Sequence, residues 1–196
     1  MWPSDRVERI GVEPLDRLRE RFLVRQFQRG NSDAFLALVR RYERRLLFFL
    51  RRFERDPERA LDVLQEVWLA AWRTRGALRS ANAFRAWIYR VAHGKVIEAI
   101  RSEMRYRQVE QERQPNEATV ATRAGASWET AELVHFALSR ISPEHREVLT
   151  LRFLEGMSIG EIAEVIDCPE GTVKSRLHYA SREILSVIEE QENGGK

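Results

Sequence analysis

The 196-residue sequence contains few of the residues that interrupt helices, with six prolines and ten glycines. No stretch shows the alternation of apolar and polar residues that is typical of a half-buried strand. No apolar run approaches the roughly 20 residues that a membrane-spanning helix needs. The opening residues, MWPSDRVERI, lack the apolar core of a secretory signal. We therefore expect an all-α, soluble and cytoplasmic protein that does not insert into a membrane.

Cysteine is represented by Cys168 alone, which excludes an internal disulfide and fits a reducing compartment. The four histidines (His93, His135, His145 and His178) do not have the spacing of metal ligands. A glycine-rich phosphate-binding loop is also absent from the sequence. We therefore expect no enzymatic activity, no metal and no cofactor.

An excess of charge of one sign is also missing. The chain has 33 Lys and Arg against 30 Asp and Glu, so its formal net charge is only +3. A weak overall charge favours local basic faces over a uniformly basic surface. The hydrophobic content of 43% is enough for one or two small domains with modest cores.

The most informative stretch is residues 158–186, which predicts two helices joined by a tight turn. Ser158 and Glu161 have the spacing of a capping box, and Pro169 suits the first position of the second helix. One face of that helix is apolar, with Val173, Leu177, Ala180, Ile184 and Ile188; the other carries Thr172, Lys174, Ser175, Arg176, His178, Tyr179 and Arg182. This is a helix-turn-helix whose second helix suits a DNA major groove. Periodicity alone leaves open an amphipathic helix with a solvated basic face.

Four helices are expected in the N-terminal part of the chain. The first runs from Pro14 to Gly30. Asn31 or Ser32 caps the second, whose apolar side has Phe35 or Leu36, Val39, Leu46, Leu50 and Phe53. Its arginines (Arg40, Arg41, Arg44, Arg45, Arg51 and Arg52) are interpreted as a solvated face that covers the core edges, in preference to a nucleic-acid contact. The third helix starts at Asp56-Pro57 and presents Asp62, Gln65 and Glu66 on one face, which without further information are ordinary surface residues.

The fourth helix, residues 84–105, combines a buried side with aromatic and basic residues elsewhere. Phe84, Trp87, Ile88, Val91 and Ile100 form the buried side, and Tyr89, Arg90, His93 and Lys95 are among the others. Rings interleaved with cations suit single-stranded DNA, in which bases stack on rings and phosphates meet cations. Packing of the aromatics in a core is the alternative, and we expect it for Trp87.

The remaining chain divides into a polar lead-in (1–13), a polar linker of low order (106–128), a second domain (129–190) and a tail (191–196). In the second domain Ser142 caps a helix that Val148, Leu151 and Leu154 line and that Gly156 ends. The expected architecture is therefore two small helical domains, an N-terminal bundle (14–105) and a C-terminal helix-turn-helix domain, joined by a flexible linker.

Three short motifs in the second domain resemble the fourth conserved region of bacterial RNA polymerase sigma factors. They are residues 143–149, with proline, arginine and valine at the family's spacing, Glu-Ile-Ala at 161–163 and GTVKSR at 171–176. The string DVLQEVWLAAWR at 62–73 resembles the most characteristic part of the family's second conserved region. The organisation of the chain, two helical domains with a linker, resembles that of the extracytoplasmic-function (ECF) subgroup of the sigma-70 family.

The resemblance implies binding to core RNA polymerase and to promoter DNA, and control by an anti-sigma protein. It implies that Asp62, Gln65 and Glu66 dock on a coiled coil of the polymerase largest subunit. It places the minus-10 element on the helix that carries Tyr89, Arg90, His93 and Lys95. It places minus-35 bases against Lys174, Ser175, His178 and Tyr179, with Thr172 and Arg176 holding the DNA backbone.

The sequence departs from the family pattern at Gly94 and Glu98, where the family usually has asparagine and often aspartate, and at Tyr179 and Ser181, where it frequently has arginine. These departures leave the preferred promoter sequence open. Two other functions also remain open: a stand-alone helix-turn-helix regulator that binds a palindrome as a dimer, and a protein–protein adaptor whose helix-turn-helix does not contact DNA.

Overall fold

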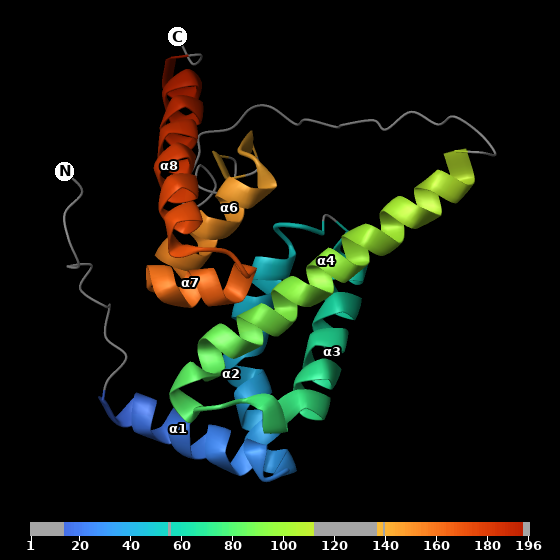
Figure 1. Ribbon diagram of the computed structural model, residues 1–196, viewed down its shortest axis with the longest axis vertical. Coiled ribbons are helices and arrows are strands. Elements are labelled where there is room, and N and C mark those ends of the chain that lie inside the picture. The colour runs from blue at the N-terminus through green and yellow to red at the C-terminus, as the bar shows by residue number, and fades with distance from the viewer. Residues whose placement is uncertain (1–13, 55, 112–136, 139, 194–196) are drawn as a thin grey trace.

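A computed structural model describes residues 14–54, 56–111, 137–138 and 140–193. In these ranges all regular structure is helical, as predicted from the sequence, and strands are absent. The long helix α4 (Phe84–Gln111) crosses the molecule, with α1, α2 and α3 packed around its first part and α6, α7 and α8 gathered on another side of it (Figure 1). The fold thus has an N-terminal half, up to α4, and a C-terminal half that contacts it.

The N-terminal half consists of α1 (Pro14–Gln28), α2 (Ser32–Leu50), α3 (Pro57–Thr74) and α4, with short 3₁₀ turns at Arg75–Ala77 and Ala81–Ala83. Caps confirm the predicted end of α1 and the predicted starts of α2 and α3. Gly30 has a φ of +85°, the left-handed conformation that glycine adopts readily after a helix. The Oδ1 atom of Asn31 accepts a hydrogen bond from the Ala34 amide at 2.8 Å, and Asp56 caps α3 in the same way through the Glu58 amide.

Aromatic rings hold this bundle together. The ring of Phe27 on α1 packs edge-on against Phe84 of α4, with 6.0 Å between ring centroids, and Phe35 of α2 lies 5.0 Å from Trp72 of α3. Such buried rings remove large apolar areas from water and gain about 0.5–1.5 kcal/mol per pair beyond that burial. Trp87, which we expected in the core, joins the same cluster through Phe27. The cluster therefore fixes α3 and α4 relative to each other.

The arginine run of α2 is not a purely solvated face, which corrects part of the sequence prediction. Arg41 binds Asp16 (Nη2 to Oδ2, 2.9 Å) and Glu20 (Nε to Oε2, 2.8 Å), both on α1. Chiefly the hydrogen bond to Asp16 raises the pKa of Arg41, so the guanidinium stays charged in this clamp. Arg45 reaches Glu155 in the C-terminal half. Two of the six arginines therefore connect α2 to other elements.

The C-terminal half contains α6 (Pro143–Leu149), a π-helical turn at Thr150–Leu154, α7 (Ile159–Ile166) and α8 (Glu170–Asn193). Ser142 caps α6 as expected, and Gly156 follows the turn with a φ of +63°. The core is apolar and is built from Val148, Leu151, Ile162, Val165, Val173 and Ala180. This core sets α8 against α6 and α7 and leaves its other face exposed.

Two other predictions need correction. Residues 106–111, predicted to start the linker, are the last residues of α4; residues 112–128 lie outside the described ranges, as do 1–13 and 194–196. Leu154 was expected to line its helix but is exposed, because Leu151 occupies the inward position. Of the two options for the α2 apolar side, Phe35 packs against the core and Leu36 is exposed. The described helices include none that is long and apolar enough to cross a membrane.

Candidate polymerase and promoter-DNA interfaces

Hydrogen bonds fix the start of α7 and the turn between α7 and α8. Ser158 and Glu161 form the predicted capping box: the Glu161 amide donates to Ser158 Oγ at 3.2 Å, and the Ser158 amide donates to Glu161 Oε2 at 2.8 Å. Asp167 ends α7 with a left-handed φ of 50°. Pro169 lies just before α8, where its carbonyl accepts from the Thr172 and Val173 amides; it is therefore not the first helical residue. The capping box thus fixes where α7 begins, and the conformation of Asp167 and the bonds to Pro169 fix the turn to α8.

One face of α8 carries all six residues that were predicted to contact minus-35 DNA. Lys174, Ser175, His178 and Tyr179 are exposed, and Thr172 and Arg176 are half-buried beside them. The rings of His178 and Tyr179 meet edge-on with 5.5 Å between centroids, and Ser175 Oγ donates to the Thr172 carbonyl. The opposite face is anchored by the buried side chains of Val173 and Ala180. The structure therefore brings these residues together on a rigid, solvent-facing surface.

The outer face of α3 carries the residues predicted to dock on polymerase. Asp62, Gln65 and Glu66 are all exposed. Leu61 and Leu69, which were not among the residues predicted to dock, flank Gln65 at helical spacing with exposed fractions of 43% and 56%. Exposed leucines beside acidic and amide groups are suited to a protein partner. Their four-residue spacing from Gln65 was the signal that could have identified them.

Tyr89 cannot stack on a DNA base in this structure, because its side chain is fully buried. Its ring packs edge-on against Phe49, with 5.3 Å between centroids. Burial, and then the charge of Glu155, raise the pKa of the Tyr89 hydroxyl, so the phenol stays protonated. The alternative of core packing, weighed for the aromatics of this helix, therefore applies to Tyr89 as well as to Trp87.

Lys95 lies toward α3, away from Arg90 and His93. Its Nζ atom is 2.7 Å from Glu98 Oε2 and 3.3 Å from Glu66 Oε2. Chiefly the hydrogen bond to Glu98 raises the pKa of Lys95. The lysine thus joins the candidate polymerase face to α4, and the four residues predicted for minus-10 DNA do not form one surface.

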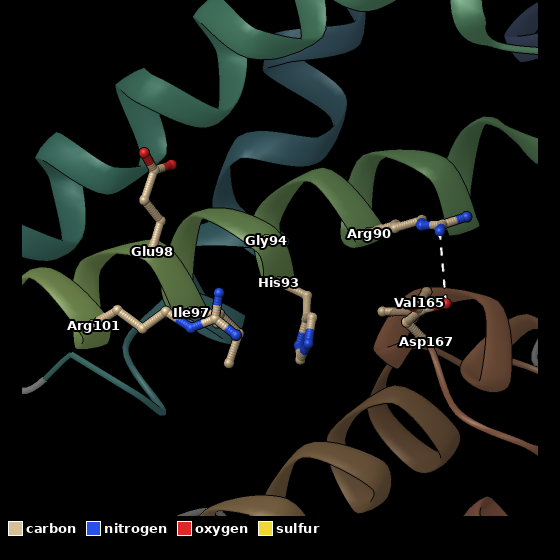
Figure 2. A pocket seen from close by; sticks show the side chains of 8 residues that line it. All are labelled: Arg90, His93, Gly94, Ile97, Glu98, Arg101, Val165 and Asp167. Atoms are coloured by element: carbon tan, nitrogen blue, oxygen red, sulfur yellow. Dashed lines mark ion pairs between the residues drawn. The ribbon is translucent and has the colours of Figure 1, made fainter.

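Arg90 and His93 lie together on the side of α4 that faces the C-terminal half, in a solvent-open hollow that Ile97 and Arg101 also line (Figure 2). The Nη2 atom of Arg90 is 3.7 Å from Asp167 Oδ1, and His93 Nδ1 is 2.6 Å from Glu147 Oε1. Gly94 opens onto the same hollow, and a Cβ atom added there would have no neighbour within 4 Å among the described residues. This side of α4 combines cations with room for a ligand.

Comparison with known proteins identifies both halves. The family description Sigma-70 region 2 matches residues 38–106, and Sigma-70, region 4 matches residues 131–184. The sigma-H factor of Pseudomonas aeruginosa RNA polymerase is 32% identical over 186 residues, which cover 85% of this chain and 92% of that protein. The chain belongs to the sigma-70 family of RNA polymerase sigma factors. Further relatives are the ECF sigma-E factors of Haemophilus influenzae and Escherichia coli, which are 30% and 29% identical to this chain. The matches span 89% of this chain and 97% and 96% of the two relatives.

Solved sigma-factor structures share the fold. CnrH, solved with the cytosolic domain of CnrY, superposes with a TM-score of 0.63 at 24% identity, over 87% of this chain and 97% of that one. RpoE of Bartonella quintana, solved with the anti-sigma factor NepR, superposes with a TM-score of 0.65 at 19% identity, over 79% of this chain and 96% of that one. This sigma factor is accordingly a transcription initiation factor of the ECF type and not an enzyme: it directs promoter-specific initiation by core RNA polymerase.

Proposed function

We propose that the sigma factor divides promoter recognition between its halves. The N-terminal half docks on core polymerase through the outer face of α3 and takes single-stranded minus-10 DNA on α4. The C-terminal half reads the minus-35 element with α8. The observation that carries this proposal is the exposed row on α8, where four polar or basic side chains project from a helix that is anchored behind by Val173 and Ala180.

The chemistry of α8 supports major-groove reading. Lys174 can offer an ammonium donor, Ser175 a hydroxyl, and His178 an imidazole to base edges, while the half-buried Thr172 and Arg176 beside them can bond to phosphates. The helix-turn-helix geometry presents the N-terminal turns of α8 outward, as the reading helix of such motifs does. We assign Lys174, Ser175, His178 and Tyr179 to bases and Thr172 and Arg176 to the backbone.

On α4 the proposal retains Arg90 and His93, with Lys95 at the border to α3, and leaves out Tyr89 because it is buried. On α3 it assigns Asp62, Gln65 and Glu66 to polymerase. Exposed carboxylate and amide groups on a rigid helix can pair with arginines of a partner helix.

We also propose a cytoplasmic location and an anti-sigma protein as a regulator. The first follows from polymerase as the partner. The second rests on the two similar folds cited above, of which one was solved with an anti-sigma factor.

Gel-shift and run-off experiments with and without core polymerase test the division of roles. We expect specific initiation from genomic promoter fragments only when the chain and core polymerase are both present, at sites with two separated, non-palindromic elements. A chain that shifts a palindromic duplex unaided, and starts no transcription with core polymerase, would show that it is a stand-alone regulator.

A further inference from the structure

The outward face of α1 carries three large apolar side chains. Leu15, Leu18 and Phe22 are 73%, 54% and 61% exposed, whereas Val24 and Phe27 of the same helix are buried in the core. The two groups lie about half a turn apart around the helix axis, so the exposed side chains point directly away from the core. Adjacent exposed apolar side chains of this size mark an interaction surface on a soluble protein.

The three exposed residues have the spacing of a coiled-coil seam. Leu18 follows Leu15 by three positions and Phe22 follows Leu18 by four, which is the a, d, a order of a heptad. In that frame Arg19 is an e position and Arg21 a g position, so one cation lies on each side of the seam. Both arginines are exposed, and neither forms an ion pair with another residue of the described ranges. We call Leu15, Leu18 and Phe22 the α1 seam.

The acidic side chains of α1 are engaged inside the fold. Asp16 and Glu20, the two acidic residues of this helix, both bind Arg41 of α2, at 2.9 and 2.8 Å. The exposed charged side chains of α1 are therefore all cations: Arg17, Arg19, Arg21 and Arg25. An apolar seam with cationic edges is complementary to an apolar surface with acidic edges.

This charge pattern argues against three other occupants. A second copy would bring the same arginines to both edges of the seam, and like charges at e and g positions repel. A DNA backbone would pair with the arginines but leave the apolar side chains in water. An anionic membrane would accept both kinds of side chain, but stable attachment requires a second anchoring signal, and the seam spans only two helical turns.

We propose that the outward face of α1 is a docking site for a partner protein that presents an acidic amphipathic helix. Apolar residues of that helix pack on the α1 seam, and carboxylates at its e and g positions pair with Arg19 and Arg21. The site lies before residues 38–106, which match Sigma-70 region 2. It lies at the end of the N-terminal half away from α8, so a docked helix leaves the reading face of α8 uncovered (Figure 1). The proposal does not depend on the residues assigned above to polymerase and DNA.

The test uses the full chain and a labelled helical peptide of about three heptads, with leucine at every a and d position and glutamate at every e and g position. A second peptide has lysine in place of each of these glutamates. Fluorescence anisotropy should show saturable binding of the glutamate peptide, at least about tenfold tighter than binding of the lysine peptide. This preference should shrink as the salt concentration rises, because the ion pairs are exposed to solvent.

Two double variants separate the apolar part of the site from the charged part. Leu18→Gln/Phe22→Gln should weaken binding of the glutamate peptide at least about tenfold, the loss expected when central apolar anchors of an interface are removed. Arg19→Gln/Arg21→Gln should reduce the preference for the glutamate peptide about threefold or more. All four positions are exposed, so the circular dichroism spectra should match that of the unsubstituted chain.

Each variant has a matched control elsewhere on the surface. Leu154→Gln/Leu185→Gln removes two exposed apolar side chains from the C-terminal half. Arg40→Gln/Arg44→Gln removes two exposed cations from α2. Both controls should bind the glutamate peptide nearly as tightly as the unsubstituted chain does.

Equal affinity for the two peptides, or equal binding by Leu18→Gln/Phe22→Gln and its control, would overturn the proposal. Two further outcomes would overturn it by assigning the seam to another occupant. Phosphatidylglycerol vesicles that bind the unsubstituted chain but not the Leu18→Gln/Phe22→Gln variant, without binding of the glutamate peptide, would assign the seam to a lipid surface. Self-association that this variant abolishes in sedimentation equilibrium, again without peptide binding, would assign the seam to a second copy.

Discussion

Replacement of Lys174 by alanine tests the reading surface of α8 without disturbing the fold. The Lys174 side chain is 63% exposed and its ammonium lies 4.0 Å from Glu170, one helical turn away. Such an exposed pair contributes only about 0.3–0.5 kcal/mol, and alanine favours the helix. The free energy of unfolding should therefore hardly change, and polymerase binding should remain intact.

The effect on promoter binding should be much larger. A good side-chain contact to a base edge contributes about 1–3 kcal/mol of discrimination, which is about 5- to 150-fold in the dissociation constant. If Lys174 also neutralises a phosphate, the slope of log affinity against log salt should fall by about 0.9. The assay is holoenzyme binding to, and run-off transcription from, a native promoter fragment over a series of KCl concentrations.

Arg182→Ala is the matched control, since Arg182 is an exposed cation two turns further along α8. It should weaken binding far less than Lys174→Ala. Equal transcription by the Lys174→Ala variant and the unsubstituted chain would refute the assignment. Equal losses in both variants would mean that α8 contributes general positive charge and does not read bases.

Three further predictions concern α3 and α7. Asp62→Ala/Gln65→Ala should abolish co-purification with core polymerase but leave the circular dichroism spectrum unchanged. The control variant Glu58→Ala, on the same helix, should co-purify normally. Unchanged co-purification of the double variant would count decisively against the docking face on α3. Ser158→Ala removes the cap of α7 and should lower the free energy of unfolding by about 1 kcal/mol in thermal denaturation. A stability within error of the unsubstituted chain would show that the box does not stabilise the start of α7. For Glu161, burial raises the pKa of the carboxyl, but the Ser158 amide and Arg85 together lower it below 4.5. The stabilising contribution of Glu161 is therefore present above pH 4.5 and is lost as the pH falls further. Glu161→Gln should flatten the curve of stability against pH below about pH 5, and an unaltered curve would show that Glu161 does not cause the loss of stability in acid.

Local features were predicted well because they depend on residues close in sequence. The capping box of Ser158 and Glu161, the cap at Asp56 and the helix end at Gly30 each require partners within a few positions. The exposed row on α8 also followed from periodicity, since Val173 and the residues at helical spacing from it had to face a core. The helical bundle and the helix-turn-helix therefore could be predicted from the sequence.

Side-chain orientation on α4 could not be predicted, because it depends on what packs on each side of the helix. Tyr89 turns inward to Phe49, which lies 40 positions earlier, and Lys95 turns to a carboxylate on α3. The partner of His93 is Glu147, 54 positions away in the sequence. Periodicity cannot specify such contacts, since it identifies an apolar stripe but not which element covers it.

The position of Lys95 has a consequence for how the two faces of the N-terminal half communicate. Its ammonium bridges Glu66, on the face assigned to polymerase, and Glu98, on the helix assigned to the promoter strand. An arginine of polymerase that pairs with the Glu66 carboxylate competes with Lys95 for it and removes one of the two ion pairs of the Lys95 ammonium. By thermodynamic reciprocity, a nucleic acid phosphate that draws Lys95 away makes Glu66 a better acceptor for polymerase. A single lysine can thus make enzyme assembly and strand capture mutually reinforcing.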